Sequence, residues 1–260
     1  KEAARLGAKT AVLDFVKPSS LGSTWGLGGT CVNVGCIPKK IMHHAALVGG
    51  VLQGAKQYGW NDAAVQKLGV QVRDHDWPML VDAVQGHIRM LNFKYRVDLR
   101  KHGVKYVNAL GRFRDATTLE VVDGKGARSC MTADQFIVAV GGRPKPLDIP
   151  GGDFALTSDD LFSHSALPKH GRILVVGGSY VALECAGLLT GLGFDVTVMY
   201  RSILLRGFDQ QVADLIREDM QSRGTRFIGE VVPCSIAESD DALEGGKKFK
   251  VRWANAKTSG

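Results

Sequence analysis

The stretch Arg172-Ile-Leu-Val-Val-Gly-Gly-Ser-Tyr-Val-Ala182 decides the fold class of this chain. Its four apolar residues before the two glycines are typical of a buried parallel strand, and the glycines mark a tight turn. Residues 180–192 then predict a helix, 194–200 a second strand and 209–223 a second helix. This β-α-β-α order predicts a doubly wound, Rossmann-like nucleotide-binding domain.

The first part of the chain contains a similar but incomplete unit. Residues 1–6 predict a helix and residues 10–16 an apolar strand, which together resemble the back half of a β-α-β unit. Helices are also predicted at 38–48 and 76–101, and strands at 104–109, 118–122, 136–140 and 249–253. Residues 145–170, rich in Pro, Gly, Asp and Ser, predict a crossover linker. We therefore expect an α/β protein with two tandem doubly wound nucleotide-binding domains, residues 1–148 and 149–260, both truncated.

Composition narrows the class of protein. The formal net charge of +7 favours anionic cofactors and an acidic protein partner, although a generally basic surface would give the same value. Lys and Arg are scattered, which disfavours nucleic-acid binding, and no apolar run is long enough to predict a membrane span. Five cysteines, three of them isolated, suggest a reducing compartment, cytoplasmic or mitochondrial. Because the chain starts at Lys1 inside a predicted helix, we expect a fragment, in which a targeting segment cannot be assessed.

The stretch Gly28-Gly-Thr-Cys31-Val-Asn-Val-Gly-Cys36-Ile-Pro-Lys39-Lys40 is the most specific in the chain. Four residues separate the two cysteines, a loop short enough to close as a disulfide. A thiolate at the predicted helix start is favoured by the helix N-terminus and by Lys39, which would lower its pKa. The glycines allow backbone to approach a flat, charged cofactor. A zinc site, which would need two more ligands, and a pair of unreactive structural cysteines are the alternatives.

Charged residues elsewhere indicate nucleotide binding. The strand 194–200 is followed by Arg201 and Ser202, with Arg206 shortly after, where an NAD-binding chain usually has Asp or Glu. Arginine matches a phosphate geometrically, so these residues favour NADPH, unless they are two solvated surface arginines. Asp14 ends an earlier strand, where a carboxylate can accept hydrogen bonds from a ribose or serve as a turn residue. Glu184 falls within an apolar helix, where burial would require a cationic partner.

One segment resembles the flavin disulfide reductases, and within them most closely the large thioredoxin reductase branch. It is Trp25-Gly-Leu-Gly-Gly-Thr-Cys-Val-Asn-Val-Gly-Cys-Ile-Pro-Lys-Lys-Ile-Met-His43. The resemblance covers essentially the whole chain. It implies that electrons pass from NADPH through FAD to a Cys31–Cys36 disulfide and on to thioredoxin, in a homodimer. It also implies that Cys31 is the interchange thiol, that Cys36 packs against the flavin, and that Lys39, near the flavin, pairs with Glu184.

The same resemblance implies two sets of cofactor contacts and no metal. FAD would be held by Asp14, Gly28, Gly29, Thr30, Lys39, Gly111, Ala139 and Gly141. NADPH would be held by Gly177, Ser179, Tyr180, Val181, Ala182, Glu184, Arg201, Ser202 and Arg206. Tyr180 matches a tyrosine that gates the nicotinamide pocket, and the family's first GxGxxG loop would lie before Lys1. Ser179 occupies the second glycine position of a dinucleotide fingerprint, a weak motif alone. Glutathione reductase, a fused thioredoxin–glutathione reductase and a non-catalytic NADPH-binding redox sensor are the alternatives.

Overall fold

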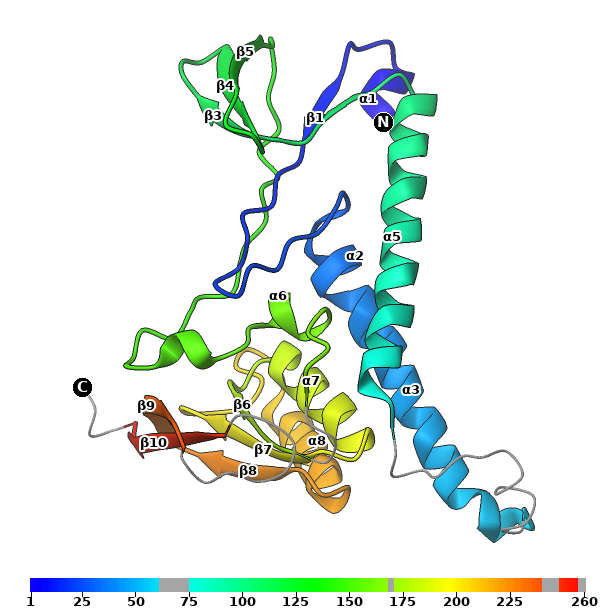
Figure 1. Cartoon of the computed structure of the whole chain (residues 1–260), viewed down its shortest axis with the longest axis vertical. Coiled ribbons are helices and arrows are strands. Elements are labelled where there is room, and N and C mark those ends of the chain that lie inside the picture. The colour runs from blue at the N-terminus through cyan, green and yellow to red at the C-terminus, as the bar shows by residue number, and fades with distance from the viewer. Residues whose placement is uncertain (61–74, 168–170, 240–247, 257–260) are drawn as a thin grey trace.

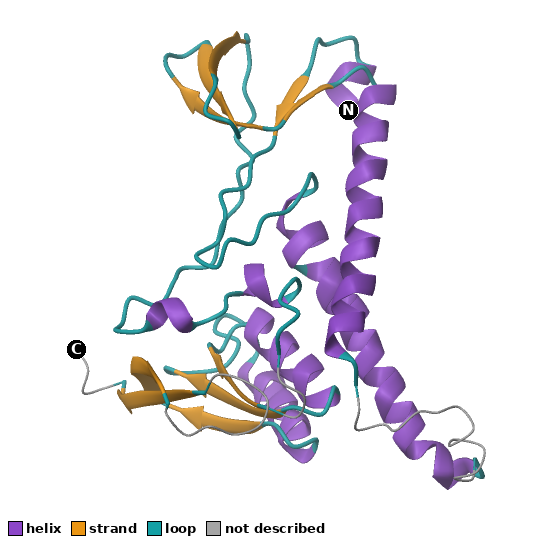
Figure 2. Cartoon of the chain, viewed as in Figure 1, coloured by secondary structure: helices purple, strands orange, loops and turns teal. Residues whose placement is uncertain are grey.

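The computed structural model describes residues 1–60, 75–167, 171–239 and 248–256. Within these ranges the chain is a mixed α/β protein with two parallel sheets and two antiparallel ones (Figures 1 and 2). A small group of strands lies at one end of the molecule and a larger α/β group at the other, and the long helix α5 runs along one side between them (Figure 1).

The smaller group contains the N-terminal elements. They are α1 (Glu2–Arg5), β1 (Ala11–Leu13), β2 (Lys105–Val107), β3 (Ala109–Phe113), β4 (Thr118–Asp123) and β5 (Arg128–Thr132). Strands β1 and β2 pair in parallel, although about 90 residues separate them along the chain. Strands β3, β4 and β5 form an antiparallel sheet, of which the sequence predicted β4 clearly and β5 not at all.

Two helices connect this group to the rest of the chain. They are α3 (Cys36–Gly54), which η1 (Ala55–Tyr58) follows, and α5 (Trp77–Lys101). The prediction of a helix at residues 76–101 is confirmed by α5. The carboxylate of Asp76 caps this helix by accepting a hydrogen bond from the Met79 N–H at 2.9 Å. Helix α3 begins at Cys36 rather than at the predicted Pro38, so the second cysteine of the pair is the first residue of the helix.

The larger group follows the predicted order closely. It contains β6 (Arg172–Val176), α7 (Tyr180–Gly191), β7 (Asp195–Tyr200), α8 (Gln210–Ser222) and β8 (Arg226–Gly229), which β9 (Val231–Glu238) and β10 (Phe249–Asn255) extend. Strands β6, β7 and β8 are parallel neighbours in that order, so each helix connects adjacent strands. The ends of β6 and β7 consequently lie together at one edge of the sheet.

The predicted strand at residues 136–140 is wrong. This stretch is extended but unpaired, and the side chains of Ile137, Val138 and Val140 are 93%, 68% and 89% exposed. Among the described residues no strand lies beside it to complete a ladder, since β1 and β2 pair with each other and β5 pairs with β4. Apolar, β-branched composition favoured a strand, but a strand also needs a neighbour.

The predicted linker contains short helices. They are η2 (Gly152–Phe154) and α6 (Ser158–Leu161), while residues 168–170 lie outside the described part of the chain. Helix α6 begins with a capping box, in which Thr157 and Asp160 satisfy each other's backbone N–H groups. This compact turn brings two buried carboxylates, Asp159 and Asp160, beneath the segment that leads to the cysteine loop.

One hydrophobic core joins α3, α5 and the larger α/β group. Met42 of α3, Val84 of α5 and Leu188 of α7 are all fully buried in it. Helices α3 and α7 approach closely because Gly191 has no side chain, and a Cβ there would lie 2.8 Å from the Cβ of Ala46. This packing fixes α3, which begins at Cys36, against α7.

Candidate redox and nucleotide site

A tight turn between two helices brings the cysteines together. Cys31 lies in α2 (Gly29–Val34) and Cys36 starts α3, with Gly35 between the helices. A Cβ on Gly35 would lie 2.9 Å from the Thr30 carbonyl oxygen and 3.1 Å from the Cys31 Cα. Only glycine therefore fits a turn this tight. Both thiols are free and exposed in this structure.

The thiol chemistry of Cys31 differs from the sequence expectation of a lowered pKa. A hydrogen bond with the side chain of Cys36, together with burial, raises the pKa of the Cys31 thiol above its ordinary value. Two sulfurs that share a proton resist the loss of it, and this outweighs the backbone N–H groups of the helix start. The prediction of a low pKa is thus wrong for Cys31. The effect of Cys36 on this pKa agrees with the tight turn at Gly35, which brings the two cysteines together.

Two buried asparagines, which no sequence motif predicts, hold the cysteine loop in place. The Asn33 Nδ2 donates to the Gly29 carbonyl at 2.8 Å, while its Oδ1 accepts from the Asn92 Nδ2 at 2.9 Å. The Asn92 amide also donates to the Leu27 carbonyl at 2.6 Å. Because Asn92 belongs to α5, these bonds fasten the loop to the longest helix of the molecule. Pairing over 59 residues leaves no local pattern to detect.

The predicted ion pair between Lys39 and Glu184 is present, but Lys39 rather than Glu184 is the buried partner. The Lys39 Nζ donates to the Glu184 Oε2, and Lys39 is the buried partner, with 10% of its side chain exposed against 54% for Glu184. The expectation that Glu184 is buried in an apolar helix is therefore wrong. The Lys39 ammonium also lies 5.4 Å from the ring centroid of Tyr180, within reach of a cation–π interaction. A buried ammonium is thus satisfied by a carboxylate and an aromatic face, both from α7.

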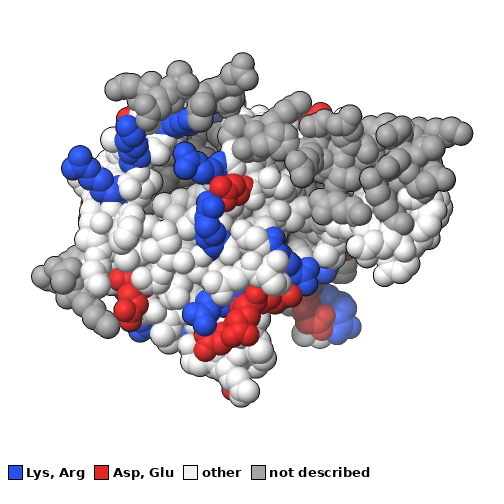
Figure 3. All heavy atoms as spheres, turned by 90° about the horizontal axis from the view of Figure 1, so that it is seen from below, with Lys and Arg blue, Asp and Glu red and all other residues white. Residues whose placement is uncertain are grey.

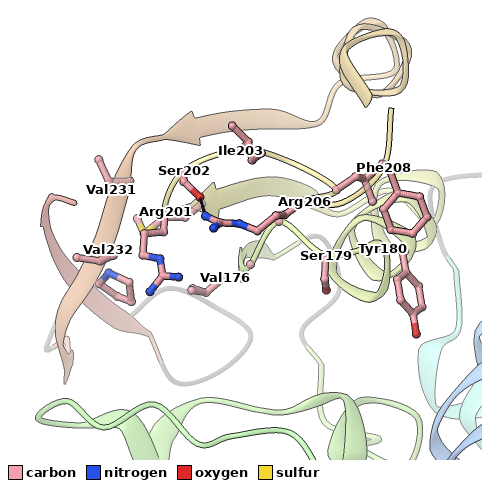
Figure 4. A pocket seen from close by; sticks show the side chains of 15 residues that line it. Val176, Ser179, Tyr180, Arg201, Ser202, Ile203, Arg206, Phe208, Val231 and Val232 are labelled. Atoms are coloured by element: carbon pink, nitrogen blue, oxygen red, sulfur yellow. Dashed lines mark hydrogen bonds between the residues drawn. The ribbon is translucent and has the colours of Figure 1, made fainter. Parts of the chain in front are cut away.

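A cavity of about 460 Å³ opens at the edge of the parallel sheet where β6 and β7 end. Figure 4 shows Tyr180 and Phe208 at one end of it, with Arg201, Val231 and Val232 at the other. The residues that line it are Val176, Gly177, Gly178, Ser179, Tyr180, Met199, Arg201, Ser202, Ile203, Leu205, Arg206, Phe208, Val231, Val232 and Pro233. Its position and size suit a nucleotide, because ligands of parallel sheets bind beyond the strand ends.

Backbone geometry shapes this cavity. Gly177 has a φ of +139°, which side-chain-bearing residues rarely adopt, and a Cβ on Gly178 would lie 3.0 Å from the Ile203 carbonyl. Ser179 caps α7, and its Oγ accepts from the Ala182 N–H at 3.4 Å. Free backbone N–H groups of the first turn of α7 therefore lie near the cavity, an arrangement that favours a phosphate.

Six of the nine residues predicted to hold NADPH line the cavity, namely Gly177, Ser179, Tyr180, Arg201, Ser202 and Arg206. Val181, Ala182 and Glu184 do not line it. The Arg206 Nη2 donates to the Ser202 Oγ at 2.6 Å, so one arginine is held over the cavity in advance (Figure 4). The wall from β9, Val231 to Pro233, was missed, because an apolar strand beyond the second helix carries no nucleotide signature.

Comparisons with known proteins bear on this geometry. Residues 1–254 match the family model of the pyridine nucleotide-disulphide oxidoreductases. The chain belongs to this family. It is also 52% identical over 254 residues to thioredoxin reductase SEP1 of Emiliania huxleyi, an alignment that covers 97% of the chain and 48% of that protein. The chain thus spans about half the length of this curated relative.

The residues that the oxidoreductase family resemblance assigns to FAD lie in several separate segments of the chain. The Asp14 Oδ2 accepts from the Gly28 N–H at 3.4 Å, which joins the end of β1 to the glycine-rich loop. Gly29 has a φ of +69°, with open space where its side chain would be, and Thr30 is exposed beside it. Ala139 and Gly141 are also exposed. Gly111 has a packing role, since a Cβ there would lie 2.9 Å from the Leu13 Cδ2.

The surface of the chain carries both basic and acidic side chains. The face seen in Figure 3 carries basic side chains in both its upper and lower halves, while most of its acidic ones lie in the lower half. Among the described residues, no three His, Cys, Asp or Glu side chains gather as metal ligands would. Nor does any described helix combine the length and the apolar character needed to cross a membrane.

Proposed function

We propose that this chain supplies the NADPH pocket and the redox-active cysteine pair of a disulfide reductase that acts on thioredoxin. In this reading, residues 1–148 form an FAD-binding domain and residues 149–260 an NADPH-binding domain, each of the doubly wound type. Membership of the oxidoreductase family and the identity to thioredoxin reductase SEP1 support the proposal. Thioredoxin as acceptor, a homodimer and a cytoplasmic or mitochondrial location belong to the same proposal.

One observation carries it: Tyr180 connects the cavity to the cysteine-bearing helix. Its ring lines the cavity on one side and faces the Lys39 ammonium on the other. Lys39 lies one helical turn after Cys36, on the same helix. This contact supports the proposal that the cavity and the cysteines act together.

The residues present fit both cofactors. Two guanidinium groups and a serine hydroxyl at the end of β7 suit the extra phosphate that distinguishes NADPH from NADH. The open backbone at Gly29 and the carboxylate of Asp14 suit a flavin nucleotide, with Lys39 supplying positive charge. FAD, when bound, supplies a two-electron carrier between NADPH and a disulfide.

The chain's own residues then perform the thiol chemistry. Reduction breaks the Cys31–Cys36 bond, and two electrons and two protons yield two thiols. Cys31 and Cys36 are both exposed, so either can meet an acceptor disulfide. The Cys31 thiolate would attack that disulfide, and the Cys36 thiolate would then displace the reduced acceptor and close the internal disulfide again. The tight turn at Gly35 keeps the two cysteines together for this closure.

The proposal is tested by NADPH-dependent reduction of thioredoxin in the full-length, FAD-loaded protein that contains this chain. Replacing Cys31 or Cys36 by Ser is expected to abolish turnover, whereas Cys130→Ser, at an exposed thiol outside the pair, should leave it unchanged. Turnover that survives both substitutions of the pair would contradict the proposal. Reduction of glutathione disulfide but not thioredoxin would favour glutathione reductase, and NADPH binding without any turnover would favour a redox sensor.

The phosphate assignment has its own test. Arg201→Glu combined with Arg206→Ala removes both guanidinium groups and adds a negative charge. Because a hydrogen bond to a charged group contributes about 1.5–3 kcal/mol, we expect NADPH affinity to fall by about 100-fold or more, with NADH affinity little changed. Calorimetric titration of both nucleotides measures this. An unaltered preference between them would refute the assignment.

A further inference from the structure

A cluster around Arg143 joins residues 17–25 to residues 143–159, two regions that are far apart in the sequence. Its Nε donates to the Asp159 Oδ2 at 2.6 Å and its Nη1 to the Lys17 carbonyl at 2.9 Å. Its guanidinium carbon also lies 4.6 Å from the ring centroid of Trp25. One planar side chain therefore contacts the segment after β1, the loop before the cysteines and helix α6.

The carboxylate partner is buried, so this contact is strong. The Asp159 side chain is 4% exposed, whereas 38% of the Arg143 side chain is exposed. A buried carboxylate needs a partner, and a guanidinium that also stacks on an indole provides one without being fully desolvated. A second bond runs parallel to it, because Ser19 donates to the neighbouring carboxylate of Asp160.

The loop that begins at Trp25 leads into α2, the helix that contains Cys31, and this other end of the loop is already fixed. Asn92 holds the Leu27 carbonyl, and Asp14 accepts from the Gly28 N–H. Arg143 thus supplies the anchor at the near end of the loop. Arg143 ties the loop to α6, and α6 packs against α2, the helix that contains Cys31.

We propose that Arg143 is a positioning residue: with Asp159 it clamps the Trp25 end of the cysteine loop and thereby keeps Cys31 beside Cys36. The relevance of this clamp to turnover depends on the disulfide reductase function proposed above. The clamp itself does not.

The test measures the reactivity of Cys31 in the chain with its thiols reduced. Arg143→Lys keeps the charge but loses the planar fork, and Asp159→Asn keeps the shape but loses the carboxylate. When Cys31 moves away from Cys36, the hydrogen bond that raises its pKa is lost, so its alkylation profile should move to lower pH. We expect alkylation of Cys31 near neutral pH to accelerate about threefold or more relative to Cys130, equally in both single variants and in the double variant.

Arg128→Lys is the matched control, since Arg128 pairs with Glu120 on an exposed hairpin. Site-resolved mass spectrometry reports each cysteine, and the emission of Trp25, obtained by difference from a Trp25→Phe chain, should change in Arg143→Lys. If Arg143→Lys does not fold, Asp159→Asn carries the test alone. An unchanged pH profile of Cys31 alkylation in a folded variant, even one of reduced stability, would overturn the proposal. Because no cofactor is used, the clamp and the reductase function can fail independently.

Discussion

Lys39 is a buried charge whose stability depends on two neighbours from another helix. Its ammonium contacts the Glu184 carboxylate and the Tyr180 ring, while Lys39 itself is only 8% exposed. An exposed ion pair contributes little, but removing one partner of a buried charge is costly. The partner that is half exposed, Glu184, therefore matters more than its own exposure suggests.

We expect Glu184→Gln to lower the free energy of unfolding by about 1–2 kcal/mol, because the Lys39 ammonium would lose its carboxylate. Urea denaturation at neutral pH measures this. Asp219→Asn is the matched control, since its pair with Arg223 is 57% and 66% exposed, and should cost less than about 0.5 kcal/mol. Equal costs for the two substitutions would show that burial of Lys39 is not decisive.

Cys185 is a thiol of a different kind from the reactive pair. Burial raises its pKa to about 11, with Glu184 raising and Lys39 lowering it to smaller extents. At pH 8 roughly one molecule in a thousand would carry this thiolate, which is the reactive form. We therefore expect iodoacetamide to leave Cys185 unmodified in the native chain while it modifies exposed Cys130 and Cys234. Peptide mapping measures the modification of each cysteine. Equal rates of modification at all three would contradict this expectation.

Helices α3 and α7 depend on one glycine for their spacing. Gly191→Ala would place a Cβ 2.8 Å from the Cβ of Ala46, while Gly50→Ala, on α3, would meet nothing within 4 Å. Alanine favours helices over glycine by about 0.8–1.0 kcal/mol, so Gly50→Ala should stabilise the chain. Gly191→Ala should destabilise it by about 1–3 kcal/mol through overpacking. Chemical denaturation compares them, and stabilisation by both would contradict the close packing.

Helix α6 links stability to pH through Asp160. Burial raises the pKa of this carboxyl, but hydrogen bonds from Ser19, Ser23 and Thr157 outweigh burial and hold it below its ordinary value of 3.8. The stabilisation is therefore complete above the ordinary pKa and is lost as the pH falls through the lowered one. We expect Asp160→Asn to be less stable than the original chain at pH 7 and to lose less stability below about pH 4. Parallel urea curves at all pH values would contradict this linkage.

Elements with a strong local pattern were predictable, and those that depend on distant partners were not. Residues 76–101 and the alternation from β6 to α8 carry apolar periodicity and caps that suffice to define them. Residues 136–140 have strand composition but no neighbouring strand in the described part of the chain. Strand β5 has mostly exposed positions, including Ser129 and Cys130, and lacks the apolar alternation that would predict a strand.

The residues of the candidate redox and nucleotide site were partly predictable for the same reason. The cysteine pair, the Lys39–Glu184 pair and the arginines of the cavity follow from motifs in which each residue type has a chemical role. The buried asparagines, the Arg143–Asp159 contact and the β9 wall come from tertiary packing between segments remote in sequence. Burial reversed one expectation, since Lys39 rather than Glu184 is enclosed. Sequence motifs indicate candidate site residues, while packing decides how they are held.

The central claim is that NADPH bound in the cavity delivers electrons to Cys31 and Cys36. The most direct measurement traps thiols in the oxidised, FAD-loaded full-length protein that contains this chain, under anaerobic conditions, before and after NADPH is added. We predict that alkylation of Cys31 and Cys36 appears only after NADPH, while alkylation of Cys130 and Cys234 is the same in both samples. The same alkylation of Cys31 and Cys36 with and without NADPH would contradict the claim.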